Sequence, residues 1–333
     1  MKYVYSLVVC LLLTAQISSA QVMRSRMKML MGARFDISLV ANDSLTAEQN
    51  IDSVIHEISR IEYLISDWID TTQVSRINQM AGIRPVKVDQ EVLELTLRAI
   101  HISEITGGAF DITFAAMERI WKFDGSMTKM PSKKVVKRAK SKVNYRNIIV
   151  DTANSTVFLK QKGMKIGFGA LGEGYATDKC RDIMLSKGIN AGFVNGSGDI
   201  STWGNQADGT PWAIGIRDPF NGADVYAIVP LQTGAVTTSG SYEKYAEIDG
   251  TRYAHIINPA TGYPASGLIS VTVFGPSAEM ANAFSTSLMV LGKEKGLAFM
   301  KQYPDYKCIM ITDWGEFITS ENFDLTPYKV ENK

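Results

Sequence analysis

The segment GFGALGEG at residues 167–174 holds the spacing G-x-G-x-x-G at Gly167, Gly169 and Gly172. A β-like stretch at 156–166 precedes it and a helix-like stretch at 175–187 follows it. Glycines at a strand-to-helix turn let backbone N–H groups approach a pyrophosphate, and the helix N-terminus favours its negative charge. The spacing therefore indicates a dinucleotide ligand.

Four further segments combine Gly, Asp, Ser or Thr with aromatic or amide side chains. They are TGGAFD at 106–111, NGSGD at 195–199, TTSG at 237–240 and HIINPATGYP at 255–264. Any one of them, taken alone, is most simply a turn that needs glycine or asparagine. Five such segments are less simply explained as turns, because binding residues concentrate on loops that a rigid scaffold holds.

The chain has three histidines. His56 and His101 lie on expected helices, where a core or surface position without chemistry is the simplest interpretation. His255 instead follows a strand-like run and precedes the turn NPATGYP. It is the best candidate for proton transfer or phosphate contact, since imidazole changes charge near neutral pH. Whether Ser239 meets His255 in space is not decided by the sequence.

Asn282, Ser285 and Thr286 have the spacing i, i+3, i+4 and share one face of an expected helix. Their amide and hydroxyl oxygens are of the type that Mg²⁺ binds, although a set without a carboxylate is weak. A buried polar stripe explains the spacing equally well. No Cys/His cluster supports zinc, and the sequence has no G-x-S-x-G nucleophile elbow.

The helices and strands that must position these loops do not follow the regular strand–helix alternation of a doubly wound sheet. Helices are expected at 47–67 (capped by Ser44 or Thr46), 90–106, 113–123, 175–187, 277–291 and 293–303. Strands are expected at 32–40, 147–150, 156–166, 192–194, 212–216, 226–230, 235–238, 253–257, 270–274 and 306–311. This order predicts an α+β fold with a largely antiparallel sheet core. A Rossmann fold is not expected, because its glycine fingerprint follows the first strand.

The composition is that of an ordinary globular protein, with 333 residues and a formal net charge of +1. This balance gives no case for nucleic-acid binding. The basic run KKVVKRAKSK at 133–142 is most simply a solvated helix or loop face. The alternative is peripheral docking on anionic lipid or on an acidic partner.

The first 20 residues have the features of a secretory signal. Lys2 precedes an apolar run at 7–13, and the small residues 18–20 precede Gln21. The run is too short for a membrane-spanning helix, and Cys10 lies inside it, so lipidation is not expected. We therefore expect a cleaved signal at 1–20, and a single exported, periplasmic domain at 21–333. Only two cysteines then remain, which allows one disulfide but no disulfide framework.

Taken in order, these segments closely resemble the ApbE family, the FAD:protein FMN transferases. Each piece is a weak signal, but the ordered set is specific and runs from about residue 31 to about residue 317. The pieces are Met31-Gly32, SDW at 66–68, SRIN at 75–78, TGGAFD, GEGYATD at 172–178, VNGSGD at 194–199, WAIGIRDP at 212–219, TTSGSYEKY at 237–245, HIINPATGYP, and ANAFST at 281–286 followed by Leu291-Gly292.

The resemblance implies a T-fold-like flavin transferase that binds FAD with Mg²⁺ on its pyrophosphate. The FMN phosphate would pass to a Thr or Ser hydroxyl of an exported flavoprotein, as in membrane redox complexes, and AMP would leave. The residues that would line FAD are Met31, Trp68, Ala109, Phe110, Asp111, Glu173 and Ile256. His255 would act at the phosphoryl centre. The metal positions would be the Ala170 carbonyl, Asn282, Ser285 and Thr286.

The chain departs from the family pattern at two positions. Many members have Asp where this chain has Gly167 and Asn282. The acidic contact expected at 167 is therefore missing, and a neutral amide weakens a hard-cation site because ligand charge tunes affinity. We interpret the chain as a member with a less acidic metal site. The alternatives are an exported protein that binds FAD without transferring FMN, and a pyrophosphatase that releases FMN and AMP to water.

Overall fold

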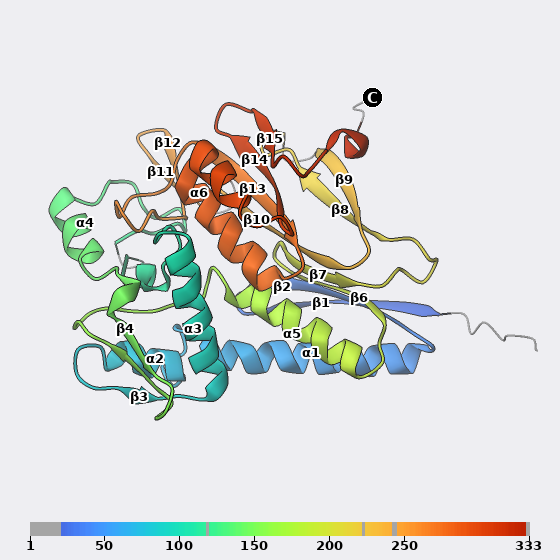
Figure 1. Cartoon of the computed structure of the whole chain (residues 1–333), viewed down its shortest axis with the longest axis horizontal. Helices are drawn as coiled ribbons and strands as arrows, with labels where there is room; N and C mark the ends of the chain where they lie inside the picture. Colours follow the sequence, from blue (N-terminus) through green and yellow to red (C-terminus); the bar gives the residue numbers. More distant parts are fainter. Residues whose placement is uncertain (1–20, 118–119, 222–223, 242–244, 331–333) are drawn as a thin grey trace, which may run out of the picture.

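A computed structural model of the chain describes residues 21–117, 120–221, 224–241 and 245–330. The expected signal at 1–20 and its Cys10 lie outside the described residues. The described chain is built on one large sheet, with long helices along it and a smaller helical and stranded part at one end (Figure 1). No helix of this described part is long and apolar enough to cross a membrane.

The large sheet has the strand order β1-β2-β6-β7-β10-β13-β14-β15, and each neighbouring pair is antiparallel. Its strands are β1 (Val22–Leu30), β2 (Ala33–Ala41), β6 (Ala191–Gly196), β7 (Asp199–Trp203), β10 (Gly234–Gly240), β13 (Leu268–Gly275), β14 (Lys307–Thr312) and β15 (Phe317–Thr319). A Rossmann fold needs parallel neighbours joined by crossover helices. The predicted α+β fold with an antiparallel core is confirmed.

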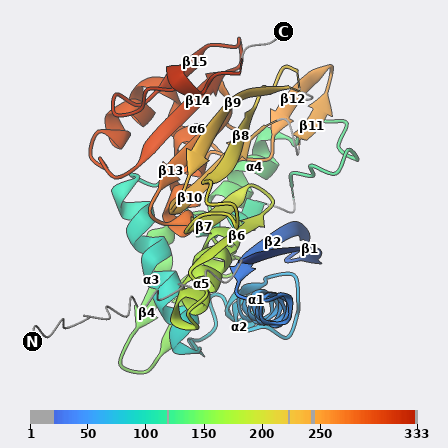
Figure 2. The same cartoon turned by 90° about the vertical axis from the view of Figure 1, so that its right-hand side faces the viewer.

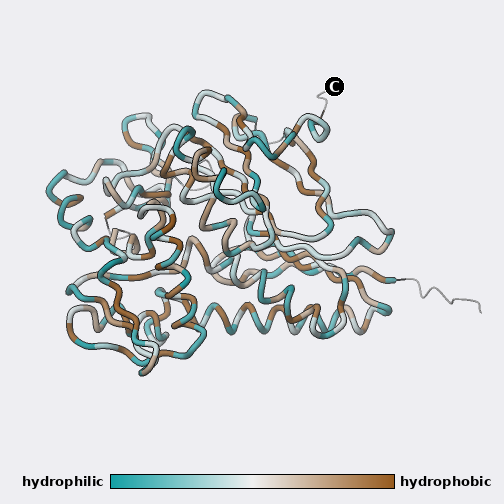
Figure 3. Tube along the Cα trace, viewed as in Figure 1, coloured by the Kyte–Doolittle hydropathy of each residue, from teal (hydrophilic) through white to brown (hydrophobic). Residues whose placement is uncertain are grey.

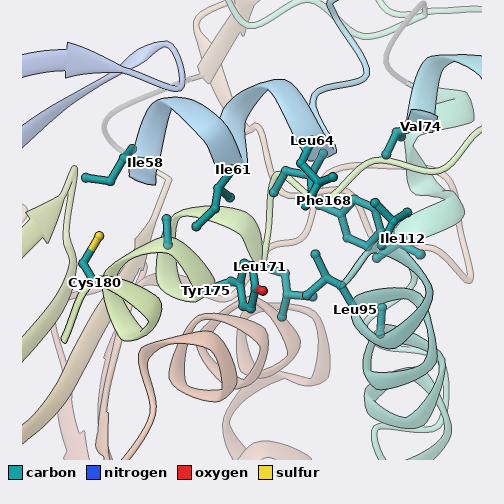
Figure 4. Packing of buried hydrophobic residues seen from close by; sticks show 14 of the residues in the cluster. Ile58, Ile61, Leu64, Val74, Leu95, Ile112, Phe168, Leu171, Tyr175 and Cys180 are labelled. Carbon is teal, nitrogen blue, oxygen red and sulfur yellow. The ribbon is translucent and has the colours of Figure 1, made fainter. Parts of the chain in front are cut away.

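Three helices cover one face of this sheet. The long helix α1 (Ser44–Ile65) packs on β1 and β2, α5 (Gly172–Ser186) on β6 and β7, and α6 (Ala278–Met300) on β10 and β13. In β2 every second side chain, Phe35, Ile37 and Leu39, is fully buried toward α1. The apolar stripe of α1 is visible as alternating colours along the helix in Figure 3, and Figure 4 shows it meeting α5.

The remaining elements lie at the ends and on the other face. A small sheet of order β3-β5-β4 and several helices form the part at one end of Figure 1, and a β8–β9 hairpin packs its apolar side against β10, β13 and β14 (Figure 2). These elements are α2 (Gln73–Gln79), α3 (Gln90–Ile105), α4 (Lys133–Lys140), β3 (Val86–Lys87), β4 (Ile148–Asp151), β5 (Thr156–Leu159), β8 (Trp212–Arg217), β9 (Val225–Leu231), β11 (Tyr245–Ile248), β12 (Thr251–Ala254), and 3₁₀ helices at Ile112–Met117, Tyr145–Asn147 and Thr326–Tyr328.

Three local expectations were wrong for identifiable reasons. Asp43, rather than Ser44 or Thr46, caps α1, because its carboxylate accepts the Thr46 N–H at 2.8 Å. Residues 118–119 of the expected helix at 113–123 lie outside the described part, and the described residues of that range form only the 3₁₀ helix Ile112–Met117. The Trp121 indole N–H beyond it donates to the Gly262 carbonyl. The expected strand at 156–166 ends at Leu159. Residues 160–166, directly before the glycine loop, are therefore not in a strand.

At Gly174 the backbones of α5 and α6 approach closely. A Cβ atom built on Gly174 would lie 2.5 Å from the Ala278 carbonyl oxygen. Nearby, one Asp178 carboxylate oxygen accepts hydrogen bonds from the Ser277 hydroxyl, at 2.7 Å, and the Glu279 N–H, at 3.1 Å. These contacts fix the start of α6 on α5, and with it the polar face of α6.

We expect Gly174→Ala to destabilise the protein, because the new Cβ atom would clash with the α6 backbone, which cannot move aside without separating the helices. Overpacking of this kind costs about 1–3 kcal/mol, which corresponds to a fall in Tm of several degrees. Gly169→Ala is the matched control, since no atom lies within 4 Å of a Cβ atom built on Gly169. Thermal unfolding measures both variants, and equal Tm values would contradict the prediction.

Candidate functional site

The polar face of α6 meets strand β10. Ser239 and Thr237 point toward α6, whereas Val236 and Thr238 point to the opposite face of the sheet. The Ser239 hydroxyl lies 2.8 Å from the Ser285 hydroxyl and 3.4 Å from the Thr286 hydroxyl. Three hydroxyl oxygens from two elements therefore gather at one point.

Asn282 extends this group toward the sheet. Its side-chain amide donates a hydrogen bond to the carboxylate of Asp199, the first residue of β7. With the Asn282 nitrogen occupied in this way, the amide oxygen is left for another partner. Asn282 is 7% exposed and Ser285 is fully buried, so the polar groups lie inside the protein.

Asp199 is held here by the NGSGD turn between β6 and β7. Ser197 and Gly198 both have positive φ, of 53° and 106°, and the Asn195 side-chain oxygen accepts the Gly198 N–H at 2.8 Å. Complete burial raises the pKa of Asp199 well above its usual range, and the negative charge of Glu173 raises it further. Two carboxylates thus face the same small volume, an arrangement that a bound cation would stabilise.

The glycine loop brings Met31 close to Glu173, and both residues are predicted to line FAD. Phe168 and Leu171 anchor it in the core. A Cβ on Gly172 would lie 2.8 Å from the Ile65 side chain and 3.4 Å from the Met31 side chain. Met31 and Gly32 form a two-residue hairpin turn with φ of 53° and 73°, which places Met31 at the loop. The half-buried residues Ala170 and Glu173 lie on either side of Gly172 in sequence.

The TGGAFD segment is held mainly by its own side chains. Phe110 is 2% exposed and belongs to the main core. Asp111 accepts hydrogen bonds from the Thr113 N–H at 2.8 Å, the Thr113 hydroxyl at 2.6 Å and the Tyr145 N–H at 2.9 Å. Both residues therefore shape the loop, as does Ala109, at 8% exposure. Trp68, at 80% exposure, has a ring free to cover a ligand.

His255 directly follows β12 and is half-buried. Its ring stands edge-on to the Phe123 ring, with 6.3 Å between the ring centroids. The next residue, Ile256, packs in one cluster with Ala281 and Phe284 of α6. The His255 segment is thereby placed against the helix that carries Asn282. His56 and His101 are exposed on α1 and α3.

Two residues of this group were not singled out from the sequence as site residues. Asp199 and Ser239 lie in segments whose composition marked them as binding loops, NGSGD and TTSG, but nothing in their spacing shows that they meet α6. The partners of Ser239 described here are Ser285 and Thr286.

One cavity of the described structure is separate from this group of polar residues. About 410 Å³ in volume, it lies on the other face of the sheet, and its lining includes Arg34, Asp36, Arg217, Thr238 and Thr272. No predicted site residue lines it. We place the candidate site on the α6 face instead, because the polar groups with chemistry converge there.

The donor atoms fit a hard cation better than zinc. Among the described residues no group of three or more His, Cys, Asp or Glu could hold a metal. Cys180 and Cys308 are buried and free, and burial raises the pKa of the Cys308 thiol to about 11. Amide, hydroxyl and carboxylate oxygens, in contrast, are the ligand types of Mg²⁺.

The chain matches one family of known proteins over most of its length. The profile of the ApbE family matches residues 31–310. The chain is 30% identical over 320 residues to a FAD:protein FMN transferase of Salmonella typhimurium, covering 91% of each protein. It is 30% identical over 276 residues to one of Treponema pallidum, covering 78% of this chain and 76% of that protein.

Solved structures show the same fold. The ApbE protein of Thermotoga maritima superposes with a TM-score of 0.85 at 31% identity, over 93% of this chain and 100% of that one. The flavin transferase ApbE of Vibrio cholerae superposes with a TM-score of 0.82 at 25% identity, over 92% and 99%. The sequence match, the common fold and the segments that converge on α6 together show that this chain belongs to the ApbE family.

Proposed function

We propose that the protein is a FAD:protein FMN transferase. It would move the FMN part of FAD to a Thr or Ser hydroxyl of an acceptor flavoprotein. The observation that carries this proposal is the convergence of Asn282, Ser285, Thr286, Ser239 and Asp199 beside the glycine loop. The names of the relatives, FAD:protein FMN transferase, support it.

The reaction is a phosphoryl transfer. The acceptor oxygen attacks the phosphorus on the FMN side, the bridging P–O bond breaks, and AMP leaves with the bonding electrons. His255 takes the hydroxyl proton as a general base. Most of the acceleration in such reactions comes from positioning and from neutralising charge on the transferring phosphate.

Mg²⁺ is part of the proposal. When bound, it would neutralise charge on the diphosphate and lower the cost of the developing negative charge. The residues that would hold it are Asn282, Ser285 and Thr286, with the Ala170 carbonyl from the glycine loop. Asp199 orients the Asn282 amide, and a bound cation would favour its charged form over the neutral form that burial favours.

The protein side of the FAD site would be formed by Met31, Trp68, Glu173 and Ile256. Trp68 offers an exposed ring for stacking. Ala109, Phe110 and Asp111 would also line FAD, and the hydrogen bonds of Asp111 fix the shape of their loop. The acceptor would be an exported flavoprotein, such as a component of a membrane redox complex. The signal-like residues 1–20 support a periplasmic site of action. The exposed lysines of α4 offer a surface for peripheral contact with a membrane.

Mass spectrometry of an acceptor domain tests the proposal. The mature protein is incubated with FAD and an acceptor that carries the family's flavinylation motif, with and without Mg²⁺. We expect a mass gain of one FMN only with the metal. An acceptor left unchanged, under conditions where another family member modifies it, would contradict transfer. A parallel reaction without acceptor separates the alternatives: FMN and AMP indicate a pyrophosphatase, and intact bound FAD a binding protein.

A further inference from the structure

Asp67 is a half-buried carboxylate that the proposed chemistry does not use. It follows the last turn of α1 and precedes the exposed Trp68. Within the described part of the chain, no hydrogen bond joins its carboxylate to the side chain of another residue. Burial raises the pKa of Asp67, while a hydrogen bond from its own backbone N–H and the charge of Lys165 partly oppose that effect. A carboxylate in this position remains costly unless a further donor reaches it.

The carboxylate lies against the start of the glycine loop. A Cβ atom built on Gly167 would be 3.3 Å from an Asp67 carboxylate oxygen and 3.1 Å from the Ala115 Cβ atom. Gly167 is itself fixed, since its N–H donates to the Ile112 carbonyl at 3.0 Å. Figure 4 shows the end of α1, at Leu64, beside Phe168 of the loop and Ile112. A side chain at 167 would thus compete with the Asp67 carboxylate for the same space.

Both neighbours of this carboxylate belong to the candidate FAD site. On one side is Trp68, and on the other the loop that continues to Ala170 and Glu173. Asp67 is therefore positioned to meet a ligand that extends from the Trp68 ring to the glycine loop. Because a carboxylate repels phosphate, the group that it meets must be an N–H or O–H donor outside the diphosphate.

We propose that the Asp67 carboxylate accepts a hydrogen bond from an N–H or O–H group of bound FAD, and that Gly167 leaves the room for it. The acidic contact expected at position 167 is then supplied from the end of α1. This inference rests on the proposed binding of FAD, but not on transfer.

Equilibrium FAD binding, followed by flavin fluorescence with Mg²⁺ and without acceptor, tests the contact. A hydrogen bond to a charged group makes Asp67→Ala about tenfold to hundredfold weaker in FAD affinity. Its Tm should not fall, because the lost group has no described side-chain partner. Asp70→Ala is the matched control, three residues further along and exposed. It should bind FAD as the wild type does.

A double variant that moves the carboxylate from position 67 to position 167 provides a second test of the contact. Gly167→Asp alone should weaken FAD binding, since it crowds the Asp67 carboxylate. In the double variant Asp67→Ala/Gly167→Asp the carboxylate returns from the opposite side of the same space, and affinity should recover. A double variant that binds no better than Asp67→Ala, with an unchanged Tm, would overturn the proposal.

Separate titrations with FMN and with ADP locate the donor. A loss for FAD and FMN places it on the flavin half, and a loss for FAD and ADP on the adenosine half. Either result supports the contact. Asp67→Ala binding FAD as tightly as the wild type would overturn it. Wild-type protein that binds FAD but modifies no acceptor would contradict transfer and leave the contact standing, whereas wild-type protein that binds no FAD would overturn both.

Discussion

Replacement of His255 by alanine should lower FMN transfer by about 10²–10⁴-fold, the usual contribution of a general base. His255 is the one histidine of the chain that the structure places beside α6, through the packing of Ile256 on Ala281 and Phe284. FAD affinity should change little, because the base acts on the acceptor hydroxyl and not on the bound nucleotide. The variant should therefore lose kcat and retain FAD binding.

Two measurements on each variant separate these effects. Acceptor modification is followed by mass spectrometry and FAD binding by flavin fluorescence. His56→Ala is the matched control, since His56 is exposed on α1, and it should leave both readings unchanged. A His255→Ala protein that transfers FMN at the wild-type rate would exclude His255 as the base. A loss of FAD affinity equal to the loss of rate would instead indicate a binding role.

Replacement of Asn282 by leucine should slow transfer at low millimolar Mg²⁺ by at least about 100-fold. Residues that only support the ligands of a metal site already contribute up to about 100-fold. The change removes the amide oxygen proposed to meet the cation. It also leaves the buried Asp199 carboxylate without the Asn282 donor. Part of the activity should return at higher Mg²⁺, because mass action offsets a weaker site.

The dependence of the transfer rate on Mg²⁺, together with Mn²⁺ binding followed by electron paramagnetic resonance, measures this effect. Ser287→Ala on the same helix is the control, since the Ser287 hydroxyl donates to the Ala283 carbonyl on another side of α6. It should keep the wild-type metal dependence. If Asn282→Leu needs no more Mg²⁺ than the wild type, the cation does not bind at this face of α6.

The local part of the fold could be predicted from the sequence. The stripe of α1, the end of α3 before Gly107 and the division of α6 at Gly292, which has φ of 74°, follow from side-chain periodicity and from glycine. One failed prediction involves a distant contact. The Trp121 indole donates to the Gly262 carbonyl 141 residues away, and the described residues 120–123 of the expected helix at 113–123 are not helical.

The candidate site, like the fold, could be predicted from the sequence only in part. Residue types and the i, i+3, i+4 spacing on α6 made His255, Asn282, Ser285 and Thr286 candidates, and the resemblance to the ApbE family implied their roles. Periodicity cannot show which loops of a sheet meet, because strand order and register depend on packing over the whole chain. Only the tertiary structure brings Asp199 to Asn282.

Gly167 shows most clearly what could not be predicted from the sequence alone. The sequence by itself determined an antiparallel α+β fold, a set of binding loops and a position at 167 without the expected acid. Only the tertiary structure decided that the Asp67 carboxylate, one hundred residues earlier in the chain, lies 3.3 Å from where a side chain at 167 would begin. The physical reason is that a site requires charge at a point in space, and the fold can deliver that charge from either of two segments that meet there.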